Sequence, residues 1–260
     1  MKNSTIIYET NLFEFMANDV GILGCHPGGK EANQLIGRAC GLKKDQFILD
    51  VGCGKASSAC YFAQQFGCRV TGIDKSEHFI NMANQLVKQN KLQNEIQLKV
   101  ANAEALPLNA NTFDAVVAQA LLIVVENTIK DKIIRESIRA LKPGGYIGFH
   151  ELSWFKFPPP EVLEHISTLL WREYVGRILT FEDWENQFKT YGIKHTVTIK
   201  KTIGGGIIGF LGDEGIRNGL KVMWRTVTHP KLRVRLMNVW EAFSKYNEYL
   251  GYGIYSFKKE

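Results

Sequence analysis

The stretch Phe47-Ile-Leu-Asp-Val-Gly-Cys-Gly-Lys-Ala56 decides the fold that this sequence predicts. Most of its first five residues are apolar or favour β-structure, which is typical of a buried strand. The Gly-Cys-Gly that follows lets the backbone turn sharply before Ala56 opens a helix. A strand, a glycine turn and a helix in this order predict a site where a nucleotide-like ligand lies on the turn.

Asp50 lies two residues before the first glycine of this turn and narrows the class of ligand. Glycine turns that open a helix often bind phosphate, because the bare amides of a helix N-terminus attract anions. A carboxylate beside the turn would repel phosphate but attract a ligand with an ammonium and a sulfonium group, such as S-adenosylmethionine. Asp74 ends the next strand about 20 residues beyond Gly54, the spacing at which an acidic side chain binds ribose hydroxyls.

Five segments resemble, in order and spacing, the motifs of class I S-adenosylmethionine-dependent methyltransferases. They are Ile48-Leu-Asp-Val-Gly-Cys-Gly54, Val70-Thr-Gly-Ile-Asp74, Ala101-Asn-Ala-Glu-Ala-Leu-Pro107, Phe113-Asp-Ala-Val-Val117 and Leu141-Lys-Pro-Gly-Gly-Tyr-Ile147. The resemblance is greatest to the small-molecule branch that includes ubiquinone, menaquinone and sterol methyltransferases. It implies an enzyme that uses S-adenosyl-L-methionine and releases S-adenosyl-L-homocysteine.

Strands that alternate with helices predict a doubly wound α/β fold with a mostly parallel sheet. The expected strands cover 47–51, 69–74, 96–100, 113–118, 146–149, 194–201 and 253–257. The resemblance implies a Rossmann-like methyltransferase fold, in which these seven strands take the order 3-2-1-4-5-7-6 and carry helical lid insertions.

We expect one structural domain with three parts. Residues 1–45 would form an N-terminal helical cap and residues 46–153 the cofactor-binding core. Residues 154–260 would complete the sheet and add helical lid or substrate insertions at 154–192 and 204–250. These insertions would exclude water and shape the substrate pocket, or else complete the hydrophobic core.

The resemblance also implies which residues bind the cofactor. The set is Asp50, Gly52, Cys53 and Gly54 at the methionyl part, Asp74 at the ribose, Lys75, Asn102, Ala103 and Glu104 around the adenine, and Gln119, Ala120 and Leu121 beneath the sulfonium. Two positions depart from the family pattern. Ala56 stands where a third glycine is usual, which the helix start should tolerate, and Asn102 replaces an aspartate but can still accept a hydrogen bond.

His150 and Glu151 are the candidate catalytic bases, because they follow the fifth strand at the edge where ligands bind. Only one of them should face the cleft, since side chains alternate along a strand. The candidate substrate residues are Tyr8, in an amphipathic helix expected near the N-terminus, and His26, Gly28 and Gly29 in a turn that opens a helix. That turn would offer amides to an anion, or would be a plain turn.

Composition limits where the protein works. No apolar run reaches the ~20 residues of a spanning helix, and the N-terminus lacks the pattern of a signal peptide. The five cysteines are an odd number without a Cys-x-x-Cys motif. This pattern fits a reducing cytoplasm rather than a disulfide framework or a zinc site, so we expect a cytoplasmic protein without a metal.

The net charge of +6 is concentrated in the last quarter of the chain, where residues 194–260 hold twelve Lys and Arg against five Asp and Glu. This excess indicates either an ordinary solvated surface or attraction to an anionic substrate, an anionic membrane or nucleic acid. Residues 119–122 lack the Asn/Asp-Pro-Pro-aromatic tetrad with which nucleic-acid amino-methyltransferases hold a flipped base. That difference argues against a nucleic-acid substrate.

Methyl transfer to a small organic or lipid-like acceptor is therefore the expected function, with an oxygen, carbon or nitrogen atom as the acceptor. The protein would act as a monomer or a homodimer. Two alternatives stay open: a non-catalytic module that keeps the cofactor fold, and a peripheral membrane enzyme that acts on a lipid or quinone.

Overall fold

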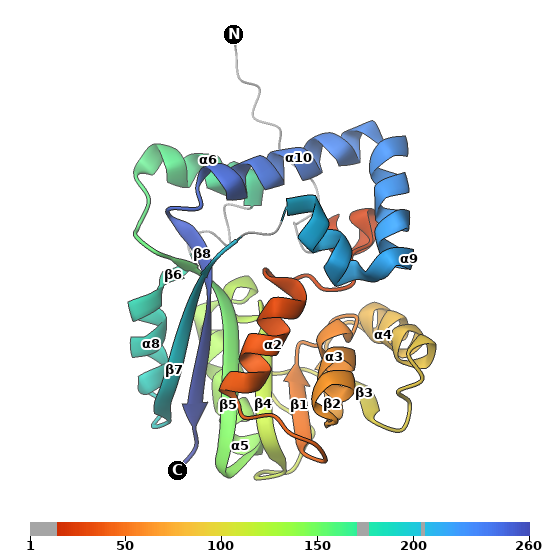
Figure 1. The fold of residues 1–260 in the computed structure, drawn as a ribbon. Helices are drawn as coiled ribbons and strands as arrows, with labels where there is room; N and C mark the ends of the chain where they lie inside the picture. The colour runs from red at the N-terminus through yellow and green to blue at the C-terminus, as the bar shows by residue number, and fades with distance from the viewer. Residues whose placement is uncertain (1–14, 171–176, 204–205) are drawn as a thin grey trace.

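An eight-stranded sheet forms the centre of the computed structural model, which describes residues 15–170, 177–203 and 206–260 (Figure 1). Its strands are β1 (Phe47–Val51), β2 (Arg69–Asp74), β3 (Ile96–Val100), β4 (Phe113–Gln119), β5 (Leu141–Trp154), β6 (Leu179–Thr180), β7 (Lys194–Thr202) and β8 (Leu250–Lys258). The order is β3-β2-β1-β4-β5-β8-β7, with β6 paired to β5. The predicted order is confirmed, since β7 and β8 are the predicted sixth and seventh strands and the short β6 only shifts the numbering.

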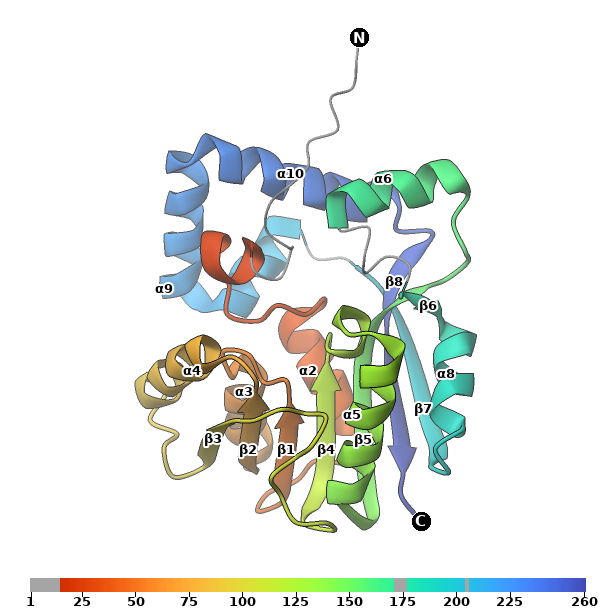
Figure 2. The same ribbon diagram turned by 180° about the vertical axis from the view of Figure 1, so that it is seen from behind.

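Helices cover both faces of the sheet and bury two apolar cores. On one face lie α2 (Gly29–Ala39), α3 (Ser57–Phe66) and α4 (Glu77–Gln89), and on the other α5 (Asn127–Ala140) and α8 (Phe181–Lys189) (Figures 1 and 2). Ile48 packs into the first core and Leu49 into the second, and both are fully buried. The near-continuous apolar pattern of β1 thus reflects a parallel strand that is covered on both faces.

The fifth strand is longer than predicted. A strand was expected over 146–149, but β5 already begins at Leu141 and includes residues 142–145, Lys-Pro-Gly-Gly. The pairing with β4 is irregular there, because the register shifts between Phe113 and Ala115 and Gly144 has a φ of +75°. β5 also extends to Trp154, where it stays paired with β8 in an antiparallel ladder. This extension carries the sheet into the lid.

Three of the described helices form a lid across the carboxyl ends of the parallel strands (Figure 2). They are α6 (Pro160–Leu170), α9 (Gly206–Thr228) and α10 (Pro230–Lys245). Ile166 of α6 and Val239 of α10 are buried against Trp154, so a third apolar cluster joins the lid to the sheet. None of the described helices is long and apolar enough to cross a bilayer.

The N-terminal segment is described from Phe15 onward, so the candidate residue Tyr8 and most of the amphipathic helix expected near the N-terminus lie outside the described residues. Its first described element is a single π-helical turn, η1 (Phe15–Val20). Phe15, Val20 and Ile22 pack against Val222 of α9. The segment therefore belongs structurally to the lid as much as to the core.

Candidate active site

The glycine turn after β1 has the backbone that its sequence predicts. Gly52 and Gly54 adopt positive φ angles of +73° and +52°, and the amides of Gly52 and Cys53 donate to the carbonyl of Ile73 at 2.9 and 2.8 Å. A Cβ at Gly54 would have no atom within 4 Å, so this side of the turn is open. Ala56 also has a positive φ, +60°, immediately before α3 begins. The helix start accepts alanine at the third-glycine position, but the left-handed backbone costs it about 1–2 kcal/mol.

Two carboxylates flank this turn. The Oδ2 of Asp74 accepts a hydrogen bond from the amide of Gly54 at 3.0 Å, and its Oδ1 accepts one from Ser76 at 2.9 Å. Asp50 is 2% exposed, and its Oδ2 has no hydrogen-bond partner within the described part of the chain. Burial, together with the charge of Asp74, raises the pKa of Asp50 to about 7. An orphaned buried acceptor beside an open turn fits a ligand that brings a hydrogen-bond donor with positive charge.

The residues expected around the adenine lie on the loop between β3 and β4. Asn102 is exposed, and its Oδ1 accepts a hydrogen bond from the amide of Glu104 at 3.0 Å. Glu104 in turn forms a salt bridge with Lys132 at 3.2 Å. Lys75 is exposed just beyond Asp74. These groups stand at the same edge of the sheet as the glycine turn, because both follow parallel strands.

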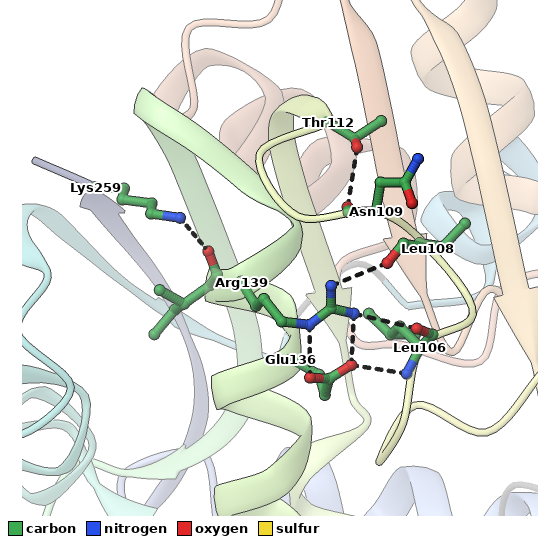
Figure 3. A network of polar contacts seen from close by, with 8 residues as sticks. Leu106, Leu108, Asn109, Thr112, Glu136, Arg139 and Lys259 are labelled. Carbon is green, nitrogen blue, oxygen red and sulfur yellow. Dashed lines mark hydrogen bonds and ion pairs between the residues drawn. The ribbon is translucent and has the colours of Figure 1, made fainter.

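Arg139 of α5 holds this loop in place (Figure 3). Its guanidinium donates to the carbonyl of Leu108 at 2.9 Å and to that of Leu106 at 3.1 Å. Glu136 accepts from the Nε of Arg139 and from the amide of Leu106, each at 2.8 Å. The network therefore ties the loop that begins with residues 102–104 to the C-terminal end of α5.

The segment after β4 packs against the glycine turn. A Cβ at Gly52 would lie 3.0 Å from a methyl carbon of Leu121, so the two segments are in close contact. Ala120 adopts a φ of +52°, uncommon for a residue with a side chain, and its amide donates to the carbonyl of His150 at 2.7 Å. The structure thus places Leu121, which directly follows Gln119 and Ala120, beside the turn, and a position of these residues beneath the sulfonium stays a prediction.

The side chains of His150 and Glu151 project from β5 on opposite faces of the sheet, as the alternation of side chains along a strand predicts. The His150 ring is fully buried, with ring centroids 5.2 Å from His26 and 4.9 Å from Tyr252. Its Nδ1 lies 3.3 Å from the Nε2 of Gln119, while its Nε2 has no partner among the described residues. Burial and the neighbouring His26 hold the pKa of His150 well below its usual value, so the ring is neutral.

Glu151 supports the backbone after β4. Its Oε1 accepts hydrogen bonds from the amides of Leu121 at 3.2 Å and Leu122 at 2.8 Å, and its Oε2 accepts one from Ile123 at 3.3 Å. The carboxylate is fully buried, and burial raises its pKa to about 7 although these amides and Lys130 oppose the rise. All these partners belong to the loop after β4 and to α5, on the face away from His26.

A cavity of about 1030 Å³ lies on the α2 and α3 side of the site. Its lining includes the predicted turn residues His26, Gly28 and Gly29, the lid residues Trp240 and Phe243, and Tyr252 of β8. Gly28 has a φ of +80°, and a Cβ there would collide with the hydroxyl of Tyr252. His26 is held by a 3.1 Å contact between its Nε2 and the Oγ of Ser58, and burial lowers its pKa to about 4.

Two residues near this site, Tyr252 and Lys55, were not predicted from the sequence. Tyr252 was placed before the expected seventh strand, and its approach to His150 depends on the antiparallel register of β8 against β5. Lys55, directly after the glycine turn, extends its ammonium to the carbonyls of Ala17 and Ile22 at 2.5 and 2.8 Å. Its position next to Gly54 was a visible signal, but its partners lie in an irregular segment that no pattern marks.

Comparisons with known proteins agree with this geometry. A family model described as a methyltransferase domain matches residues 48–145. An uncharacterized protein of Haemophilus influenzae is 28% identical over 221 residues, which span 84% of this chain and 86% of that protein. A demethylmenaquinone methyltransferase of Lactobacillus johnsonii is 33% identical over 114 residues, 43% of this chain and 46% of that enzyme. The chain thus matches less than half the length of that enzyme.

A solved structure shares the whole architecture. The S-adenosylmethionine-dependent methyltransferase of Thiobacillus denitrificans, crystallised with S-adenosyl-L-homocysteine, superposes with a TM-score of 0.70 at 18% identity. The superposition covers 98% of this chain and 100% of that one. At this identity the likeness concerns the fold. Together with the methyltransferase model and the glycine turn, it identifies the chain as a member of the class I S-adenosylmethionine-dependent methyltransferases.

Proposed function

We propose that this protein transfers a methyl group from S-adenosyl-L-methionine to a small organic or lipid-like acceptor. The observation that carries the proposal is the open glycine turn between Asp74 and the unpartnered buried carboxylate of Asp50. A phosphorylated nucleotide would meet the charge of Asp74 and oppose the ionisation of Asp50, whereas a ligand with an ammonium and a sulfonium would favour the ionised form of both carboxyl groups. When bound, S-adenosylmethionine supplies the reactive methyl carbon, so the protein has to position two molecules and exclude water.

The residues of the turn and its neighbours divide this task. In the proposal, Asp50, Gly52, Cys53 and Gly54 hold the methionyl part and Asp74 holds the ribose. Lys75, Asn102, Ala103 and Glu104 surround the adenine, and Gln119 and Ala120 lie beneath the sulfonium. The exposure of Asn102 and the fixed loop behind it suit a group that reads the edge of a bound base.

The acceptor would enter through the cavity beside His26. Burial keeps both His26 and His150 neutral near pH 7, so each ring has one nitrogen without a proton, and the same burial makes both rings weak bases. His150 is the better candidate base, because its Nε2 is unpartnered within the described chain while both oxygens of Glu151 already accept backbone amides. We therefore assign His150 to proton transfer from the acceptor, His26, Gly28 and Gly29 to its binding, and Glu151 to positioning the loop after β4.

The lid helices would exclude water from the reaction, with Trp240 and Phe243 facing the acceptor from α10. A reducing compartment, the cytoplasm, belongs to the proposal because all five cysteines are unpaired and four of them are buried. The acceptor is proposed as a small molecule, and the acceptor atom as oxygen, carbon or nitrogen.

A labelled-methyl assay tests the proposal. The purified chain is incubated with S-adenosylmethionine that carries a radiolabelled methyl group and with fractionated metabolite pools. We expect label in a small organic product together with an equal amount of S-adenosyl-L-homocysteine. Binding of the cofactor without transfer from any pool would instead support a non-catalytic module. Preferential binding of NAD or ATP at the turn would overturn the charge argument itself.

A further inference from the structure

The outer face of α9 carries an exposed apolar stripe. Leu220, Met223, Trp224 and Val227 follow the i, i+3, i+4, i+7 spacing of one helix face and are 47–70% exposed. The opposite face of the same helix is occupied, because Val222 packs against the N-terminal segment and Asn218 donates to the carbonyl of Gly21. Burial against the rest of the described chain therefore does not explain this stripe.

The stripe continues on the next helix. α10 begins at Pro230, directly after the corner that ends α9, and exposes Val234 and Met237 by 49% and 63%. Its inner face is buried through Val239 and Ala242. Both helices form the outer border of the lid, away from the sheet (Figures 1 and 2). We call the six exposed residues Leu220, Met223, Trp224, Val227, Val234 and Met237 the lid stripe.

Basic residues accompany the lid stripe. Residues 215–240 contain six Lys and Arg and no Asp or Glu. Five of these basic side chains are exposed: Arg217, Lys221, Arg225, Lys231 and Arg233. An exposed apolar stripe with an aromatic residue and a basic border has the composition of a surface that rests on the headgroups of an anionic bilayer.

The positive charge beside the lid stripe also favours an anionic bilayer over a second copy of the chain as its binding partner. A two-fold dimer would place the same patch of each copy against the other, and so would bring the basic residues of both copies together. Such like-charge contact weakens an interface, whereas an anionic lipid surface is attracted by the same residues. Trp224, the most exposed member of the lid stripe at 70%, is a side chain type that favours the boundary between headgroups and acyl chains.

We propose that the lid stripe docks on anionic membranes, with its apolar residues in the headgroup region and the neighbouring Lys and Arg on lipid phosphates. This docking site is separate from the cofactor site and does not depend on the identity of the methyl acceptor. It needs no membrane-spanning helix, because an interfacial helix face inserts only to the level of the headgroups.

Vesicle binding tests the proposal with the full chain. Vesicles of phosphatidylcholine with 30% phosphatidylglycerol, a chosen probe composition, should sediment the protein at low ionic strength, and added salt should release it. Substituting Lys221, Lys231 and Arg233 with Gln together should lower the partition coefficient roughly 100-fold. The matched control is K88Q/K91Q/K99Q, which removes the same number of exposed charges on the α4 side and should leave the partition coefficient unchanged.

A depth measurement gives the second readout. Brominated lipids should quench the fluorescence of the wild-type protein, and W224F, which keeps an aromatic side chain, should lose that quenched component while it still binds. Equal binding to neutral and anionic vesicles, or equal loss in the α4 control, would overturn the proposal. So would sedimentation showing a dimer that M223D/W224D converts to a monomer, because the lid stripe would then be a contact between copies.

Discussion

Lys55 and Glu214 hold the same segment from two sides, although one follows the glycine turn and the other lies on the lid helix α9. The ammonium of Lys55 donates to the carbonyls of Ala17 and Ile22, and both carboxylate oxygens of Glu214 lie 2.9 Å from the amide of Leu23. Residues 17–23 therefore connect the turn that would bind the cofactor to the lid that would cover it. Hydrogen bonds to the backbone of this segment thus link the residue that follows the glycine turn to the lid.

Replacing Lys55 with Met should loosen this connection. The variant keeps the length of the side chain but leaves two carbonyls without their charged donor, which we expect to lower the free energy of unfolding by about 2 kcal/mol. Hydrogen exchange at the amides of residues 17–24 should rise more than in the core strands. K88M, which removes an exposed lysine from α4, is the control. Uniform exchange in both variants would show that Lys55 does not hold the segment.

Asp50 should make the protein without ligand less stable as the pH rises. The folded pKa of about 7 exceeds the unfolded value of about 3.9, so the folded state binds the proton more tightly. The contribution of protonated Asp50 to the free energy of unfolding is fully present below pH 4 and is lost as the pH rises toward 7. Asp50→Asn should therefore stabilise the protein at pH 8, by an amount on the order of 1.4 kcal/mol for each pH unit between the two values.

The same variant should bind S-adenosylmethionine more weakly, because the neutral amide no longer offers a charge to the ammonium and sulfonium groups. Urea unfolding at pH 5 and pH 8 measures the stability, and calorimetry measures the affinity. A D50N protein that is less stable at pH 8 and binds the cofactor as tightly as the wild type would refute both parts.

Asp74→Ala should weaken cofactor binding about ten-fold or more, since a charged acceptor for the ribose hydroxyls is lost. The change also removes the acceptor of the Gly54 and Ser76 amides, so a folded state must be verified by circular dichroism. Asp74→Asn, which retains one acceptor oxygen, should fall between the wild type and the alanine variant. Unchanged calorimetric affinity in folded Asp74→Ala would disprove the ribose assignment.

His150 and Glu151 should respond differently to substitution. His150→Gln should reduce the rate of methyl transfer by about 100-fold or more if the ring accepts the proton of the acceptor. The low pKa of His150 predicts no fall in that rate between pH 8 and pH 6, because the ring is already neutral there. Glu151→Gln should keep most of the rate but change stability above pH 7, where the buried carboxylate is charged. A large loss of rate in Glu151→Gln with little loss in His150→Gln would instead assign proton transfer to Glu151.

Arg139→Ala should release the loop between β3 and β4. The loss of its bonds to Leu106 and Leu108 is expected to cost about 1–2 kcal/mol of unfolding free energy, reduced by the partial exposure of the side chain. Cofactor affinity should fall with it, because residues 102–104 lie on the same loop. Arg135→Ala, one turn earlier, removes the exposed pair with Asp131 and a contact with the ring of Tyr191 but no bond to the loop, so it should have little effect on either measurement.

The sequence by itself determined the first strand, the glycine turn and the two carboxylates beside it, whereas the strand order came from the resemblance to a known family. These features depend on local patterns: a run of buried residues for β1, glycines where the backbone needs positive φ, and an acidic residue at the end of β2. Helix caps are equally local: the Oγ1 of Thr180 accepts a 3.1 Å hydrogen bond from the amide of Asp183 at the start of α8.

Only the tertiary structure decided which partners the functional side chains meet. Alternation predicted that one of His150 and Glu151 would face the cleft, but not that Glu151 would accept the amides of the β4 loop. Tyr252 reaches His150 through the register of an antiparallel strand at the far end of the chain. Apolar residues of the lid were equally visible in the sequence, yet Trp240 lines a cavity while Trp224 is exposed. Burial and pairing depend on contacts between distant segments, and no local pattern contains that information.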